Sequence, residues 1–106
     1  MPQWTDIGPA EDYRNAARKC VTLAQAHLIV FHVDQKFYAI RNTCPHAGLP
    51  LSDGELKGKV ITCPFHGYAF NIENGKNIDF PDDSPVTIYP VRTTDAGRVE
   101  VDMEPV

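Results

Sequence analysis

The sequence of 106 residues has little positive charge and no long apolar run. Its 10 Lys and Arg are outnumbered by 14 Asp and Glu, which gives a formal net charge of −4. Without a basic stripe to release counterions, we expect no nucleic-acid partner. No stretch approaches the ~20 apolar residues that a membrane-spanning helix needs, and the first residues lack the pattern of a signal peptide. We therefore expect one cytoplasmic domain, residues 1–106, without a membrane partner.

Cysteine is scarce as well, since the chain holds three: Cys20, Cys44 and Cys63. Cys20 has no obvious disulfide partner in a reducing cytoplasm. It lies in the strand-like run Arg18–Leu23, where a lone cysteine usually packs as a small buried hydrophobic side chain. We therefore predict that Cys20 is buried and has no redox role.

The two other cysteines each stand close to a histidine. Cys44-Pro45-His46 and Cys63-Pro64-Phe65-His66 each offer one thiolate and one imidazole. Such ligands can bind one metal ion or a two-iron cluster, because thiolates select zinc, copper and iron–sulfur centres while imidazole accepts zinc, copper and iron. A zinc finger with two Cys and two His places both Cys in one loop and both His on a helix. The mixed motifs favour a cluster held between two loops, with a single zinc ion as the alternative.

The segments C-P-H-A-G-L-P-L at 44–51 and C-P-F-H-G-Y-A-F at 63–70 closely resemble the Rieske family. In that family two His replace two Cys on one iron of a [2Fe-2S] cluster. The resemblance implies a base of antiparallel sheets with a cluster-binding portion, at about 43–68, inserted between strands. It also implies four cluster ligands, which are Cys44, His46, Cys63 and His66.

The apolar pattern predicts an all-β domain built as a small sandwich or barrel of antiparallel sheets. The expected strands are Leu28–Val33, Lys36–Asn42, Lys59–Thr62, the alternating run Tyr68–Ile72, Val86–Arg92 and Arg98–Asp102. Asp34-Gln35 and Asn74-Gly75 are the expected tight turns, the second because Gly tolerates a positive φ. Only Ala10–Ala17 looks briefly helical.

The surroundings of the two motifs favour a low reduction potential. High-potential Rieske proteins carry a disulfide between the two ligand loops, and the matching positions here are Leu49 and Phe65. They also place hydroxyl donors where this chain has Tyr68, a bulkier residue, and Phe70, which has no hydroxyl. Since hydrogen bonds to sulfur raise the potential, we expect a value in the lower half of the family span of about −150 to +300 mV.

Three further features are weaker signals. Residues 80–85, F-P-D-D-S-P, resemble the proline-bearing loop that covers the cluster in the Rieske family. The acids near the motifs are expected to be solvated, and they can steer a basic partner at low salt. They are Asp53, Glu55, Asp79, Asp82 and Asp83. His27 and His32 have no Cys at ligand spacing and are expected to be ordinary strand residues.

These features predict a soluble one-electron carrier that passes electrons from a reductase to a terminal oxygenase. An alternative is a small subunit of an oxidoreductase that resembles nitrite reductase, with a large subunit as its partner. The Rieske portion of a ring-hydroxylating oxygenase is a third interpretation, although 106 residues leave no room for the second iron domain of such an enzyme. A zinc-stabilised interaction module is the fourth. We expect no catalytic residue and no small-molecule substrate.

Overall fold

The computed structural model describes residues 3–14, 18–23, 26–45, 50–64 and 67–103. Strands dominate these ranges, which confirms the all-β prediction. In chain order the elements are β1 (Trp4–Pro9), α1 (Glu11–Arg14), β2 (Arg18–Thr22), β3 (His27–Val33), β4 (Lys36–Arg41), β5 (Glu55–Lys57), β6 (Val60–Thr62), β7 (Ala69–Asn71), β8 (Ile88–Tyr89), β9 (Val91–Thr93) and β10 (Arg98–Asp102). No helix in the described ranges is long and apolar enough to cross a membrane.

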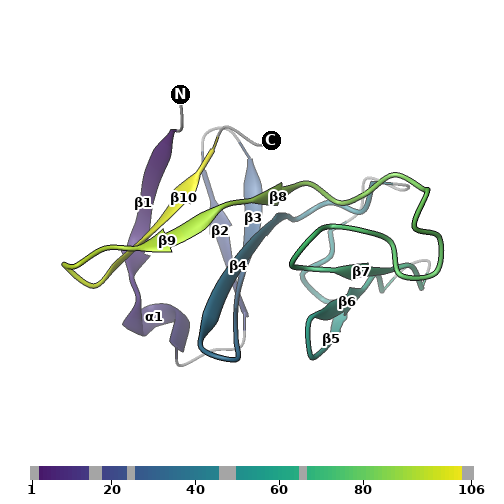
Figure 1. Cartoon of the computed structure of the whole chain (residues 1–106), viewed down its shortest axis with the longest axis horizontal. Helices are drawn as coiled ribbons and strands as arrows, with labels where there is room; N and C mark the ends of the chain where they lie inside the picture. The colour runs from purple at the N-terminus through teal and green to yellow at the C-terminus, as the bar shows by residue number, and fades with distance from the viewer. Residues whose placement is uncertain (1–2, 15–17, 24–25, 46–49, 65–66, 104–106) are drawn as a thin grey trace.

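The strands form three antiparallel sheets that follow one another along the long axis of the molecule (Figure 1). Their strand orders are β1-β10-β9, β2-β3-β4-β8 and β5-β6-β7. In the sequence, β5, β6 and β7 lie between β4 and β8, which are hydrogen-bonded neighbours in the central sheet. The third sheet is therefore an insertion between two paired strands of the base, as the family resemblance implied.

The central sheet is buried on both faces, and β3 shows why its sequence is apolar without interruption. Successive side chains of a strand point to opposite faces. Leu28 and Val30 accordingly join the interior shared with β10, whereas Ile29 and Phe31 join the interior shared with β6 and β7. The run Leu28–Phe31 thus contributes side chains to two cores. For this reason its sequence does not alternate between apolar and polar residues.

Both expected turns are present. Asp34 and Gln35 connect β3 to β4 with φ values of 51° and 66°. Two successive residues with positive φ form the tight hairpin turn whose twist matches that of the flanking strands. After β7, the chain turns at Asn74-Gly75, and Asn77 then returns to make an antiparallel bridge with Phe70.

The prediction of one strand over Val86–Arg92 is wrong. The segment divides at Pro90 into β8, which pairs with β4, and β9, which pairs with β10. Proline has no N–H for a ladder, so it suits the point where a chain passes from one sheet to the next. Its carbonyl accepts the N–H of Asp102 at 2.9 Å. Strands β1 and β5 were not predicted, because β1 contains Gly8 and Pro9 and β5 is very short.

The prediction of a buried Cys20 is also wrong, since this residue is exposed. Cys20 pairs with Ile29 of β3 and shares its face of the sheet. However, β2 is an edge strand of the central sheet. A side chain at the edge can lack a covering layer even on the face that is otherwise buried, and the local sequence does not reveal this.

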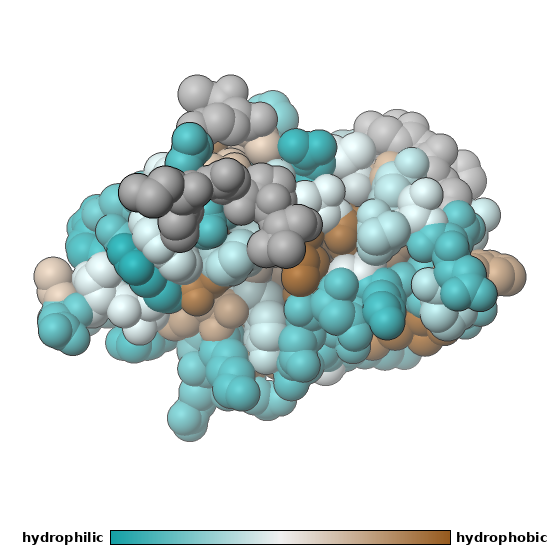
Figure 2. All heavy atoms as spheres, turned by 45° about the horizontal axis from the view of Figure 1, so that its top comes forward, coloured by the Kyte–Doolittle hydropathy of each residue, from teal (hydrophilic) through white to brown (hydrophobic). Residues whose placement is uncertain are grey.

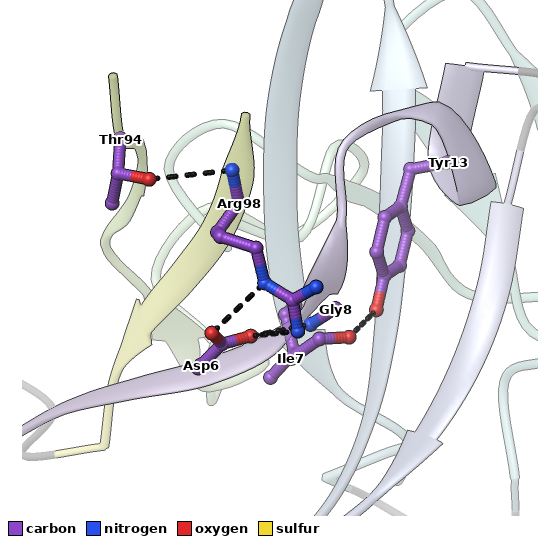
Figure 3. A network of polar contacts seen from close by, with 6 residues as sticks. All are labelled: Asp6, Ile7, Gly8, Tyr13, Thr94 and Arg98. Atoms are coloured by element: carbon purple, nitrogen blue, oxygen red, sulfur yellow. Dashed lines mark hydrogen bonds and ion pairs between the residues drawn. The ribbon is translucent and has the colours of Figure 1, made fainter. Parts of the chain in front are cut away.

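A polar network fastens β1 to β10 and α1 (Figure 3). Arg98 donates two hydrogen bonds of 3.0 Å to the carboxylate of Asp6, which also accepts the N–H of Gly8 at 2.8 Å. These hydrogen bonds hold the pKa of Asp6 below its ordinary value. The buried Tyr13 donates its hydroxyl to the carbonyl of Ile7 at 2.5 Å. Burial, then the nearby acids Asp12 and Asp6, raises the pKa of the Tyr13 phenol.

Two glycines with the same backbone conformation provide a test of the packing. Gly75 has φ 79°, and an added Cβ would lie 2.4 Å from the carbonyl oxygen of Val86. Gly97 has φ 76° and open space around the added atom. Gly97→Ala should lower the free energy of unfolding by about 1 kcal/mol through backbone strain alone. Gly75→Ala should lower it further, because a backbone carbonyl must move. Urea unfolding followed by circular dichroism measures both, and equal losses would contradict the close approach at Gly75.

Candidate metal centre

Cys44 and Cys63 lie in the same apolar interior, between the central sheet and the third sheet. Their exposed fractions are 0% and 1%, and neither forms a disulfide. The buried neighbours in this interior come from both sheets and from the loops between them: Ile29, Phe31, Ile40, Leu51, Ile61, Phe70, Ile72 and Val86. The two cysteines, from different loops, therefore belong to one buried cluster.

Cys63 is placed at the start of a short loop that joins β6 to β7. Thr62 pairs with Ala69, so residues 63–68 close the hairpin. The N–H of Cys63 donates to the carbonyl of Tyr68 at 2.6 Å, and the N–H of Gly67 donates to the carbonyl of Cys63 at 3.1 Å. These cross-loop hydrogen bonds fix the backbone on which the second thiol stands.

Cys44 stands in the loop that follows β4, and one amide side chain closes this loop. The Oδ1 atom of Asn42 accepts the N–H groups of Leu51 at 2.8 Å and Ser52 at 3.0 Å. A short polar side chain beside a loop often satisfies backbone donors in this way. The two ends of the first motif are thereby held together at its base.

The turn at residues 51–54 connects both cysteine loops to the central sheet. Arg18 on β2 donates Nη1 to the carbonyl of Ser52 at 3.0 Å and also to the carbonyl of Gly54. A Cβ on Gly54 would lie 2.1 Å from the carbonyl oxygen of Thr62, the residue before Cys63. This turn therefore packs directly against the strand that leads into the second loop, while Asn42 ties it to the first.

A second polar contact joins the third sheet to the central sheet. Lys59 forms an ion pair of 2.9 Å with Glu73, and Tyr38 of β4 donates its hydroxyl to the same carboxylate at 3.4 Å. The hydrogen bond between Lys59 and Glu73 raises the pKa of the lysine and lowers the pKa of the glutamate. Both side chains are substantially exposed, so water weakens this contact relative to the buried packing.

His46 and His66, the two predicted imidazole ligands, lie outside the described residues, as do Leu49 and Phe65. Within the described ranges, no three metal-binding side chains lie together. His27 is an exposed residue of β3, and His32 lies against the ring of Phe37 with a centroid distance of 4.7 Å. The expectation of ordinary strand histidines is confirmed for both.

The structure also places the other residues that the sequence analysis named near the two motifs. Phe70 is fully buried beside the cysteines, and Tyr68 packs against the same interior. Phe80, in the segment that resembles a covering loop, contacts Tyr68 with a ring-centroid distance of 6.3 Å. All the acids predicted to be solvated are exposed: Asp53, Glu55, Asp79, Asp82 and Asp83.

Comparison with known proteins identifies the family. The model of the Rieske [2Fe-2S] domain matches residues 3–90. This chain belongs to the Rieske [2Fe-2S] domain family. Ferredoxin CarAc of Metapseudomonas resinovorans is 36% identical to it over 99 residues, which cover 92% of each chain.

Solved structures agree with this Rieske assignment. A chain in the complex of reduced oxygenase and oxidized ferredoxin in carbazole 1,9a-dioxygenase is 34% identical, with a TM-score of 0.86, and the match covers 100% of this chain and 98% of that one. A Mycobacterium tuberculosis protein assigned as the small subunit of an NADH-dependent nitrite reductase is 25% identical, with a TM-score of 0.82, and the match covers 100% and 99%.

The cofactor of the Rieske domain is a [2Fe-2S] cluster, and the described donor atoms fit it. Thiolate sulfur is the protein ligand that iron–sulfur centres use most. Here two buried thiols, neither of them in a disulfide, enter one apolar interior from adjacent loops. A solvent-excluded pair of soft ligands of this kind suits a cluster better than a surface-bound ion.

The role of Asn42 can be tested with two substitutions of similar size. Asn42→Leu removes the acceptor for the N–H groups of Leu51 and Ser52, so the first loop should open and purified protein should contain clearly less iron and sulfide. Asn42→Asp keeps the acceptor oxygen and should retain the wild-type content. Iron and acid-labile sulfide assays measure the difference. Full loading of Asn42→Leu would show that this side chain does not hold the loop.

Proposed function

We propose that this chain is a one-electron carrier that passes electrons from a reductase to a terminal oxygenase. The observation that supports it most directly is the burial of Cys44 and Cys63 together in a Rieske domain. A relative named as a ferredoxin matches the chain over 92% of both lengths. A carrier needs a cluster, a protein scaffold and a surface for its partners, and the described fold supplies the scaffold.

In this proposal Cys44 and Cys63 bind one iron through their thiolates, and His46 and His66 bind the other iron through imidazole nitrogen. The cluster supplies a site that gains and loses a single electron, at a potential raised by its neutral imidazole ligands. The apolar interior around the thiols excludes water from the sulfur side. The same packing places Cys44 and Cys63 in one buried cluster.

A second function is a small subunit of a reductase, because the Mycobacterium tuberculosis protein has nearly the same fold and length. Its identity of 25% is lower than the 36% of the ferredoxin relative. A permanent subunit should purify with a large partner, whereas a carrier should purify alone. The zinc module receives no support from the family match.

We further propose that the protein works in the cytoplasm. All three cysteines lie in the described ranges, and none is in a disulfide. A reducing compartment maintains such thiols and protects an iron–sulfur centre from oxidation.

The thiolate ligands can be tested against the third cysteine of the same chain. Cys44→Ser and Cys63→Ser should each lose most of the iron and sulfide, because a serine oxygen is a harder ligand and deprotonates reluctantly. Cys20→Ser is the matched control, since Cys20 is exposed on β2, and it should load fully. Normal loading of either ligand variant would contradict the assigned site.

The carrier role is tested by rapid mixing under anaerobic conditions. Reduced protein is mixed with the terminal oxygenase encoded closest to its gene, and the return of the oxidised visible spectrum is followed. We expect oxidation with a rate proportional to oxygenase concentration. No oxidation, or co-purification with a large reductase subunit, would overturn the role as a mobile carrier for an oxygenase.

A further inference from the structure

Two apolar side chains stand out on the surface of the described residues. Ile78 is 46% exposed and Phe80 is 56% exposed, and they are the large hydrophobic residues that the described part of the chain leaves exposed. Both belong to one segment between β7 and β8, at the end of the molecule that holds the third sheet. At this end hydrophobic and hydrophilic side chains lie side by side on the surface (Figure 2).

The exposed position of Phe80 is built by specific hydrogen bonds. The Oδ1 atom of Asn77 accepts the N–H groups of Asp79 and Phe80, each at 3.0 Å. The N–H of Ile78 donates to the carbonyl of Ala69 at 2.8 Å, and the N–H of Asp83 donates to the carbonyl of Phe80 at 2.9 Å. The segment is therefore held to β7 and closed on itself, so the ring of Phe80 projects from an ordered backbone.

Holding this segment has a cost in stability. Asn77 is 1% exposed, and its Nδ2 donor has no hydrogen-bond partner among the residues that the structure describes. A buried, unpaired amide N–H is destabilising, and each such group in a native protein needs an explanation. Local features that cost stability are typical of functional sites. The Oδ1 atom of the same side chain holds the backbone of Phe80 in place. We take this role to be the reason for the buried Asn77.

Two acids beside Phe80 have no ion-pair partner among the described residues. Asp79 and Asp82 are exposed, and neither forms an ion pair with a described residue. Elsewhere on the surface, several acids are paired with a base: Asp6 with Arg98, Glu73 with Lys59 and Glu100 with Arg92. An exposed aromatic ring between two exposed acids fits a partner that has an apolar pocket and a basic rim.

This surface lies beside one of the cysteine loops. The ring of Phe80 contacts the ring of Tyr68 at 6.3 Å and an interplanar angle of 69°. The carbonyl of Tyr68 in turn accepts the N–H of Cys63. A partner seated on Phe80 would thus be close to the loop that carries Cys63.

We propose that Phe80, flanked by Asp79 and Asp82, anchors this chain on its terminal oxygenase, which meets it with an apolar pocket rimmed by Lys and Arg. The inference rests on the carrier role proposed above. An aromatic side chain with two torsions loses little entropy on docking and is a typical anchor of a protein interface. The carboxylates steer the approach and fix its orientation.

Charge favours the electron acceptor over the electron donor as the occupant. An electron held at this end adds one negative charge next to the acids. A basic surface therefore attracts the reduced protein more strongly than the oxidised protein. An acceptor must bind the reduced form and release the oxidised form, whereas a reductase must do the reverse. The acidic surface thus fits the oxygenase.

The anchor is tested by the second-order rate constant for oxidation of the reduced, cluster-loaded protein by the oxygenase described above. Phe80→Ala should lower this constant at least about tenfold, as expected for loss of a central aromatic contact. Phe80→Tyr keeps the ring and should restore most of the rate. Iron content and the visible spectrum should be unchanged in both variants, because the side chain is exposed.

The charges are tested by ionic strength. The double variant Asp79→Asn, Asp82→Asn should react more slowly at low salt, and its rate should depend less on salt than that of the wild type. The matched control is Asp34→Asn, Asp95→Asn, which removes the same charge in the β3–β4 and β9–β10 turns and should keep the wild-type rate and salt dependence.

Three results would overturn the anchor. They are a wild-type rate for Phe80→Ala, an equal loss in the control pair, or slower reduction by the reductase with normal oxidation by the oxygenase. The last result would assign the surface to the electron donor. If the wild-type protein is not oxidised by the oxygenase at all, the carrier role itself fails, and this outcome is distinct from failure of the anchor.

Discussion

The burial of two thiols in one apolar interior is the constraint on which the rest of this structure depends. Thiolate sulfur is the soft ligand that iron–sulfur centres use, and a cofactor bound between these two side chains would add its binding free energy to that of folding. Cys44 and Cys63 come from loops that are separated in sequence. Both can enter one interior only if the loops are held at a fixed distance from each other. Asn42, Arg18 and the close approach of Gly54 to Thr62 supply this distance.

The central sheet makes this arrangement possible because it packs on both faces. Through Leu28 and Val30 it forms one core with the sheet that contains β10, and this core contains no cysteine. Through Ile29 and Phe31 it covers the interior with the thiols. The base thus has packing of its own, and the third sheet is added to a surface that is already ordered.

Most of the fold was predictable where local chemistry decides it. The β3–β4 hairpin follows from an apolar run and a two-residue turn, and the motifs that contain Cys44 and Cys63 identify the family by themselves. The failures have a common cause in contacts distant in sequence. Pro90 divides a strand between two sheets, and Cys20 is exposed because β2 is an edge. Arg18 gives no local signal of its contact with a turn more than thirty residues away.

The central claim is that nitrogen and sulfur from this chain hold a pair of irons at the end of a β domain. Pulsed electron paramagnetic resonance of the dithionite-reduced protein tests it most directly. The account predicts a signal from one unpaired electron shared by two irons, with hyperfine coupling to histidine nitrogen that disappears when both His46 and His66 are replaced by Cys. A colourless protein with one zinc ion, or an iron signal without nitrogen coupling, would contradict it.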